Sequence, residues 1–165
     1  MKHLILLRHA KSSWNNPELD DMDRPLNKRG KRAAGDLAKW FRREGWMPDE
    51  ILCSAARRTR ETLDRLKLPR EAEFRDDIYE APPGALFAAL QGAAGDTVMM
   101  VGHNPGIGAL AQILAAEKPD HPRFDDYPTG AVTILRFDLA DWAALQPGSG
   151  EVVDFLTPRD LAPTA

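Results

Sequence analysis

Aliphatic runs that end abruptly in polar residues recur along the first two thirds of the chain. The first occupies residues 2–7, the second is EILCS at residues 50–54, and the most pronounced is DTVMMVG at residues 96–102. Continuous apolar runs of this length are typical of strands buried on both faces of a parallel sheet. A shorter run, EFRDDIY at residues 73–79, predicts one further strand.

Apolar residues at helical spacing separate these runs. The clearest helix is predicted over residues 28–44, with Asn27 as its N-cap and Gly45 just past its end. Three other segments have the same character: residues 55–66, residues 85–92 after Pro82, Pro83 and Gly84, and residues 105–117 with Pro105 in the first turn. Strand and helix therefore alternate through most of the chain.

The C-terminal part departs from this alternation. Residues 130–139 and 150–156 resemble two strands joined without a long helix, and we expect them to pair antiparallel at the edge of the sheet. The complete pattern predicts an α/β fold, a three-layer αβα sandwich whose sheet is mostly parallel with an antiparallel edge strand. Without repeats or a linker, residues 1–165 are expected to form a single domain.

Composition narrows the classes of function. A formal net charge of −3 disfavours a general nucleic-acid binder, and the basic residues within 27–45 are expected to form a solvated helix face. No apolar run approaches the roughly 20 residues of a membrane span, and no secretory signal pattern precedes the first strand, so a cytoplasmic location is expected. The single cysteine, Cys53, suits a reducing compartment and a place in the core.

Ionisable residues follow every predicted parallel strand. Ligands of open parallel sheets bind outside the carboxyl ends of the strands, where such residues would meet. They are Arg8 and His9 after the first strand, SAARRTRET after the second, Tyr79 and Glu80 after the third, and His103 and Asn104 after the strand at 96–102. The sequence therefore predicts a pocket with two histidines, an arginine pair and a carboxylate.

The chemistry of such a pocket favours phosphate. Guanidinium groups offer planar forks of donors that match a dianionic oxyanion. Helix N-termini after the strands would add backbone N–H groups, and Asn104 stands at one of these helix starts.

Four segments resemble, in order and spacing, the histidine phosphatase superfamily. They are LLRHAKS, CSAARRTRETL, IYEAPPGAL and VMMVGHNPGI, and they are most similar to the short bacterial SixA-type branch of phosphohistidine phosphatases. The likeness extends from Lys2 to about Phe137, and DMDRPLNKRG and YPTGAV are also typical of that branch. The resemblance implies a phosphoglycerate mutase-like fold.

The resemblance also implies roles for individual residues. His9 would be the nucleophile that becomes transiently phosphorylated, and the phosphoryl oxygens would be bound by Arg8, Arg58 and His103. Asn104 is expected to contribute to phosphate binding as well.

The motif after the second strand selects one arginine of two. The family pattern runs Ser, Pro, any, any, Arg, and Ser54 aligns with the serine, which selects Arg58 and not Arg57. The chain departs from the family at Ala55, where proline is usual, and at Ala10, where glycine is usual.

Elementary chemistry supplies a mechanism for these residues. An imidazole attacks phosphorus only when it is neutral, with the attacking nitrogen aimed by a hydrogen bond from the other ring nitrogen. Nearby Arg8 and Arg58 would disfavour protonation of His9 and stabilise charge on the equatorial oxygens. Glu80 could protonate an oxygen leaving group and then activate water, or it could be a plain solvent-exposed carboxylate.

Several other polar residues have simpler expected roles. Arg57 and Arg60 should face solvent, away from the helix face that Arg58 shares with Thr62. Asp23 and Arg24 are expected to form an ion pair that orders their loop, with a place on the rim of the pocket as the alternative. His3 and His121 are expected to be ordinary surface residues, and the sequence does not choose between Ser12 and Ser13 as a phosphate donor.

We therefore expect a phosphatase that hydrolyses phosphohistidine on a partner protein through a phosphorylated His9, without a metal or cofactor. A general small-molecule phosphomonoesterase and a non-catalytic phosphate- or phosphopeptide-binding module are the alternatives. A metal-dependent phosphatase is disfavoured, because the spacing of His9 and His103 matches no common zinc pattern and the arginines would repel a cation. A mutase generally needs longer insertions around its substrate.

Overall fold

A six-stranded sheet forms the centre of the structure, a computed structural model that describes residues 1–162. In spatial order the strands are β3, β2, β4, β1, β5 and β6. Their bounds are β1 Lys2–Arg8, β2 Glu50–Ser54, β3 Ala72–Arg75, β4 Thr97–Gly102, β5 Val132–Phe137 and β6 Glu151–Leu156. The first four are mutually parallel, β5 is antiparallel to β1, and β6 is antiparallel to β5. This confirms the mixed, mostly parallel sheet with antiparallel pairing at one edge.

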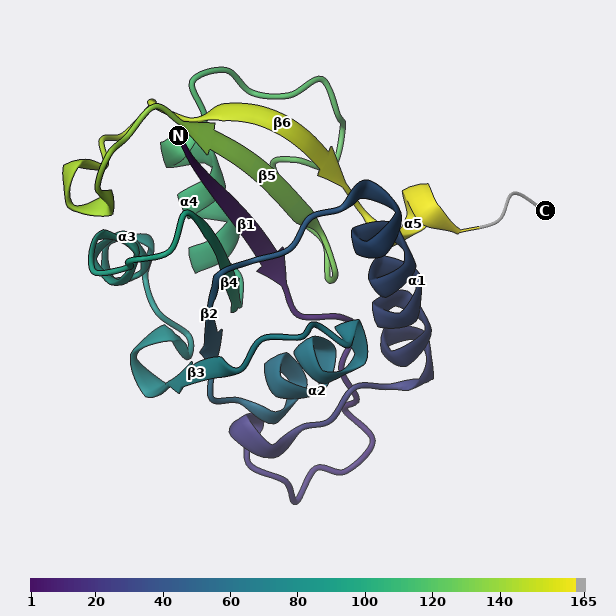
Figure 1. The fold of residues 1–165 in the computed structure, drawn as a ribbon. Coiled ribbons are helices and arrows are strands. Elements are labelled where there is room, and N and C mark those ends of the chain that lie inside the picture. The colour runs from purple at the N-terminus through teal and green to yellow at the C-terminus, as the bar shows by residue number, and fades with distance from the viewer. Residues whose placement is uncertain (163–165) are drawn as a thin grey trace.

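Helices cover both faces of the sheet (Figure 1). They are α1 Lys28–Glu44, α2 Arg57–Leu66, α3 Pro83–Gln91, α4 Gly106–Leu114 and the short α5 Pro158–Leu161. Within residues 1–162, none of these helices has the length and apolar character that a membrane crossing requires.

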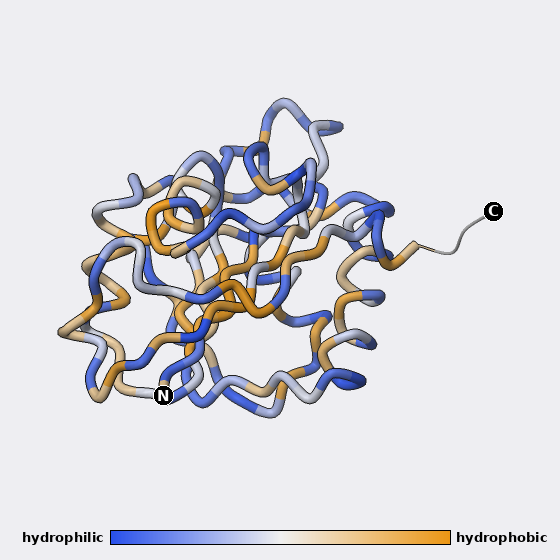
Figure 2. The backbone as a smooth tube through the Cα atoms, turned by 90° about the horizontal axis from the view of Figure 1, so that it is seen from above, coloured by the Kyte–Doolittle hydropathy of each residue, from blue (hydrophilic) through white to orange (hydrophobic). Residues whose placement is uncertain are grey.

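The core is divided into two layers by the alternation of side chains along the strands. On β1, Leu4 and Leu6 pack with α3 and α4, whereas Ile5 and Leu7 pack with α1 and α2. Figure 2 shows the hydrophobic segments concentrated along the central strands. Strands that are apolar on both faces need helices on both sides, which is the αβα arrangement that the continuous apolar runs predicted.

Several predicted elements differ from the structure at their ends, and three of these differences have a clear origin in the structure. The strand expected over residues 73–79 stops at Arg75 and is followed by a 3-10 turn, because its partner β2 ends at Ser54, opposite Arg75. The helix expected over 105–117 runs only to Leu114, because Ala115 leaves it to form a bridge with Gly150. The helix expected over 55–66 begins two residues later, at Arg57.

Candidate active site

The side chains predicted for the site follow three neighbouring strands. β1 and β4 pair in parallel with Arg8 opposite Gly102, so His9 and His103 leave the sheet side by side. Their ring centroids lie 5.2 Å apart. β2 flanks β4 and leads into α2, whose second residue is Arg58. The fold thus gathers Arg8, both histidines and Arg58 at one edge of the sheet, and all but the half-buried Arg8 are buried.

His9 is a neutral ring with one free nitrogen. Its Nδ1 lies 2.7 Å from the carbonyl oxygen of Ala10, and because a carbonyl oxygen only accepts, Nδ1 carries the proton. Despite this hydrogen bond, burial lowers the pKa of His9 to about 3, assisted by the neighbouring His103, Arg8 and Arg58. At pH 7 the Nε2 atom therefore keeps its lone pair.

His103 is a second neutral, buried imidazole. Its Nε2 lies 2.7 Å from the Oγ of Ser54, and the ring of Tyr79 packs against it edge-on with centroids 5.4 Å apart. Burial, followed by the charge of Arg58, lowers the pKa of His103 to about 3. The ring is therefore an uncharged hydrogen-bonding group at neutral pH.

Arg58 lies beneath two carboxylates. Its Nη1 donates to the carbonyl oxygen of Asp21 at 2.7 Å, and its Nη2 donates to Asp21 Oδ2 at 3.0 Å and to Glu80 Oε1 at 3.1 Å. The Arg58 side chain is 2% exposed, whereas those of Asp21 and Glu80 are 40% and 52% exposed. The two acids form a solvent-facing rim above a buried cation.

Arg8 is held from the other side by the loop that precedes β5. Its Nη1 donates at 3.0 Å to the carbonyl oxygen of Tyr127, which also accepts from Asn104 Nδ2 at 2.9 Å. Asn104 donates in addition to the carbonyl oxygen of Asp126, and its Oδ1 accepts from the backbone N–H of Gly108. The amide of Asn104 is thus engaged with backbone groups and braces the loop that holds Arg8.

Three nitrogens at this edge are buried without a hydrogen-bond partner in the part of the chain that the structure describes. They are Arg8 Nε, Arg58 Nε and His103 Nδ1. Buried polar groups are almost always paired, so these atoms call for a ligand that accepts hydrogen bonds. Because two of them belong to guanidinium groups, an anion is the ligand that fits.

Two residues at the site have left-handed backbone conformations that side chains disfavour. Glu80 has a φ of 52° and Tyr127 a φ of 47°. Such conformations cost about 1 kcal/mol each and persist where the surroundings enforce them. Glu80 contacts Arg58 and Tyr127 contacts Arg8, so both strained residues position a guanidinium group.

Helix α2 is tied directly to the residue after His9. The Oγ1 of Thr62 accepts from the backbone N–H of Ala10 at 3.0 Å and donates to the carbonyl oxygen of Arg58 at 2.7 Å. At Ala55, where proline is usual in the family pattern, the backbone N–H donates to the carbonyl oxygen of Arg75 at 3.2 Å. This bond, which proline could not make, fixes the turn into α2.

The opposite face of α2 is solvated. Arg57 is exposed and pairs with Glu61 at 2.7 Å, and Arg60 is exposed as well. The prediction that these two arginines face away from the site is confirmed, whereas Thr62 is buried together with Arg58.

The ion pair expected between Asp23 and Arg24 is wrong. Arg24 is buried and its Nε donates to Asp21 Oδ1 at 3.1 Å, whereas Asp23 is exposed. The segment forms a 3-10 turn, in which residues three apart lie on one side, so Asp21 is the acid that faces Arg24. Arg24 also donates to the Oγ of Ser12 at 2.9 Å, while the Oγ of Ser13 accepts from a neighbouring backbone N–H.

Asp21 is a site residue that the sequence interpretation missed. Besides Arg24 and Arg58 it binds the hydroxyl of Tyr79, which donates to its Oδ2. Burial raises its pKa, but the hydrogen bonds from Tyr79, Arg58 and Arg24 outweigh burial and lower the pKa to about 2. The available signal was its place at the start of DMDRPLNKRG, a segment already noted as typical of the family branch.

The other two histidines lie outside this cluster. His3 packs against Trp46 with ring centroids 5.4 Å apart, and His121 Nε2 lies 2.9 Å from Asp160 Oδ2. Both are half-buried, less exposed than the surface positions expected for them. Among residues 1–162, no group of three His, Cys, Asp or Glu side chains is arranged to hold a metal ion.

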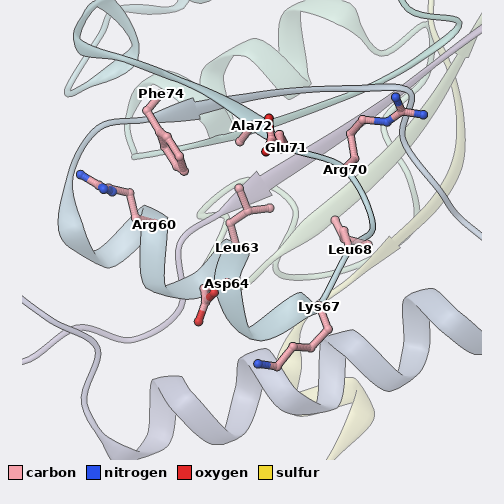
Figure 3. Close-up of a pocket in the computed structure, with 9 residues that line it drawn as sticks. All are labelled: Arg60, Leu63, Asp64, Lys67, Leu68, Arg70, Glu71, Ala72 and Phe74. Carbon is pink, nitrogen blue, oxygen red and sulfur yellow. The ribbon is translucent and has the colours of Figure 1, made fainter.

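A separate hollow of about 590 Å³ lies between α2 and β3, away from the histidines. Figure 3 shows its apolar residues Leu63 and Leu68, with Arg60 and Phe74 toward one end. The guanidinium carbon of Arg60 lies 4.9 Å from the centroid of the Phe74 ring. Since it contains neither histidine nor Arg58, we place the candidate site at the histidine pair and not in this hollow.

Comparison with known proteins places this geometry in a family. The model of the histidine phosphatase superfamily (branch 1) matches residues 4–87. An uncharacterized protein of Mycobacterium tuberculosis is 34% identical over 161 residues, which cover 93% of this chain and all of that protein.

Solved structures agree with the family match. A SixA protein from Nakamurella multipartitia, provisionally assigned as a phosphohistidine phosphatase, is 28% identical with a TM-score of 0.83, covering 95% of this chain and 96% of that one. A SixA protein from Agrobacterium tumefaciens with the same provisional assignment is 27% identical with a TM-score of 0.75, covering 95% and 98%. The predicted fold class and SixA-type likeness are thereby confirmed.

Proposed function

Because this chain belongs to the histidine phosphatase superfamily (branch 1), we propose that it is a metal-independent phosphatase that removes phosphate from phosphohistidine on a partner protein. The observation that carries the proposal is the neutral His9, whose Nε2 is free beside a set of buried, unpartnered donors. A neutral nucleophile next to fixed cationic donors is the arrangement that phosphoryl transfer requires.

In the proposed first step, His9 Nε2 attacks phosphorus and the bond to the leaving nitrogen of the substrate breaks. The hydrogen bond from Nδ1 to the Ala10 carbonyl aims the ring and stabilises the positive charge that it gains. Arg8, Arg58 and His103 would hold the phosphoryl oxygens through the nitrogens that lack partners in the protein. If the Ser54 hydroxyl donates to His103 Nε2, the proton of the neutral ring is on Nδ1, where it can be donated to a phosphoryl oxygen.

In the second step, water attacks phosphorus, the bond between phosphorus and His9 Nε2 breaks, and inorganic phosphate leaves. Glu80 would accept a proton from this water. Its contact with Arg58 at 3.1 Å and its half-exposed side chain support this role. Asp21 fixes the Arg58 guanidinium and remains ionised, as its lowered pKa requires.

Two features favour phosphohistidine over an alkyl phosphate. An imidazole leaving group can be protonated from solvent and needs little help from an enzymic acid, whereas an alkoxide needs a strong acid. The only acids that touch Arg58 in the described chain, Asp21 and Glu80, form an exposed rim and not an enclosed chamber. A side chain displayed on another protein can reach such a site.

Steady-state hydrolysis of two substrates tests the proposal. We expect the wild type to have a higher kcat/KM for a phosphohistidine peptide than for an alkyl phosphomonoester. Glu80→Gln should lower kcat/KM for the phosphomonoester far more than kcat/KM for the peptide. This ratio reports the first step, in which only the alkoxide needs a proton donor, and not the attack by water that both substrates share. Equal losses on both substrates, or a wild-type preference for the phosphomonoester, would instead indicate a general small-molecule phosphatase.

A further inference from the structure

A second pocket, of about 260 Å³, lies beside the candidate active site. Its side chains come from four segments of the chain, and no acidic residue lines it. The lining cations are Lys11, Arg29, Arg123 and Arg159, with Ala33, Pro128, Thr129, Thr157 and Pro158 between them. We name these residues the basic pocket. Its composition contrasts with the whole chain, whose formal net charge is −3.

Topology places the basic pocket at the same sheet edge as the two histidines. Lys11 is two residues past His9, and α1, which carries Arg29, begins at this edge. Pro128 and Thr129 stand between Tyr127, which binds Arg8, and Gly130, whose N–H donates to the His9 carbonyl oxygen at 2.9 Å.

The remaining wall of the basic pocket follows β6. This strand runs parallel to β1, since each is antiparallel to β5, so its carboxyl end reaches the same edge. Thr157, Pro158 and Arg159 come directly after it. His103 and Arg58 follow β4 and β2 on one side of β1, and the basic pocket lies over β5 and β6 on the other.

Most of its charge is uncompensated. Arg123 is paired with Asp126 at 2.9 Å. Within residues 1–162, Lys11, Arg29 and Arg159 make no ion pair, and all three are exposed. Three free cations around one hollow repel one another unless an anion joins them, so the basic pocket attracts negative charge.

We propose that the basic pocket binds acidic side chains that flank the phosphohistidine on the protein substrate. This inference rests on the proposed function and adds the chemical class of its partner surface. The cations are exposed and stand on separate segments, an arrangement that suits several carboxylates of a docked surface better than one enclosed phosphate. Complementary charge of this kind accelerates association and selects among partners.

Two phosphohistidine peptides test the inference, identical except that glutamates flank the phosphohistidine in one and glutamines in the other. Each exposed charge pair contributes a factor of about 1.5 to 5, so we expect the wild type to prefer the acidic peptide about tenfold in kcat/KM. The triple variant Lys11→Gln, Arg29→Gln, Arg159→Gln should lower this preference to about one. The neutral peptide serves as the internal reference for each variant.

Arg42→Gln is the matched control. Arg42 is an exposed cation of α1 outside the basic pocket, about 20 Å along the helix from Arg29. This variant should keep the preference for the acidic peptide.

Four results would overturn the inference. A wild type that hydrolyses both peptides equally well would remove the basic pocket from substrate selection and leave the proposed function intact. If the preference for the acidic peptide survives in the triple variant, charges outside the basic pocket cause it. The same conclusion follows if Arg42→Gln loses the preference to the same extent. Hydrolysis of neither peptide would overturn the proposed function itself, and this inference with it.

Discussion

Arg57 and Arg58 are neighbours in the sequence but occupy opposite environments. Arg58 is buried with an unpartnered Nε, and Arg57 is a solvated partner of Glu61. We expect Arg58→Ala to lower kcat/KM roughly 10- to 150-fold, the value of one charge-assisted hydrogen bond, and Arg57→Ala to change it by no more than a few fold. Steady-state kinetics on one phosphorylated substrate measures both. An inactive Arg57→Ala beside an active Arg58→Ala would show that the motif is displaced by one residue.

The two site histidines make the stability of the protein depend on pH. His9 and His103 have pKa values lowered by burial to about 3 in the folded chain, whereas an unfolded histidine titrates near its ordinary value of about 6.5. Below that value the unfolded state binds more protons. The free energy of unfolding is therefore unaffected by these two groups above about pH 6.5, and it decreases progressively as the pH falls toward 3.

Replacing one of these histidines should weaken that dependence. Between about pH 7.5 and pH 4.5, protonation of each histidine in the unfolded state lowers the free energy of unfolding by roughly 2 to 3 kcal/mol. His103→Gln should therefore lose about 2 kcal/mol less of its free energy of unfolding over this range than the wild type, as measured by urea denaturation. Equal losses in both proteins would mean that His103 is protonated in the folded state.

At the scale of single residues, the sequence predicted those site residues that a nearby motif or strand end identifies. His9, Arg58 and His103 stand directly after apolar runs or inside short motifs, and they do gather at one edge. Asp21 was not predicted because its contacts with Arg58 and Tyr79 span 37 and 58 residues, and no periodicity records such pairings.

At the scale of the elements, helix α1 packs closely against the loop after β1, which follows His9. A Cβ atom on Gly30 would lie 2.0 Å from the Lys11 carbonyl oxygen, whereas one on Gly35, in the same helix, meets nothing within 4 Å. Gly30→Ala should therefore push α1 from the loop that follows His9 and destabilise the protein by about 2 kcal/mol or more. Gly35→Ala should stabilise it by up to about 1 kcal/mol, the helix propensity gained.

Urea denaturation of these two variants and the wild type measures the difference. The same substitution in one helix controls for propensity, so only the contact with Lys11 separates the variants. Equal stabilisation by both would show that α1 does not press against the His9 loop.

The ends of helices and strands were predicted correctly where neighbouring residues in the sequence determine them. Helix α1 has the predicted bounds because Asn27 accepts from the Gly30 N–H at 2.8 Å and Gly45 adopts a φ of 74°. β3 and α4 end earlier than predicted because a partner strand stops at Ser54 and because Ala115 pairs with Gly150. Such endings depend on tertiary pairing and have no local sequence signal.

At the scale of the whole molecule, the strand order determines which residues meet. The alternating pattern predicted a parallel sheet but not that β4 lies between β1 and β2. This order places His103 between His9 and Arg58. It also leaves β5 and β6 beside β1, so the candidate active site and the basic pocket lie at the same edge of the sheet.

The proposed mechanism uses only side chains of the protein. It therefore predicts how chelators and phosphate analogues affect activity. EDTA should leave kcat/KM unchanged, and vanadate or tungstate should inhibit competitively by occupying the arginine-lined site. Phosphate release in the presence of each reagent measures both effects. Loss of activity in EDTA with recovery on adding zinc or magnesium would contradict the mechanism.

The central claim is that His9 itself carries the phosphoryl group during turnover. A single-turnover reaction with a phosphohistidine peptide labelled at phosphorus, quenched in base, would preserve a phosphorylated imidazole for mapping by mass spectrometry. The account predicts a transient label on His9 that decays as inorganic phosphate appears, and no label in His9→Ala. Label on another residue, or full turnover in His9→Ala, would contradict it.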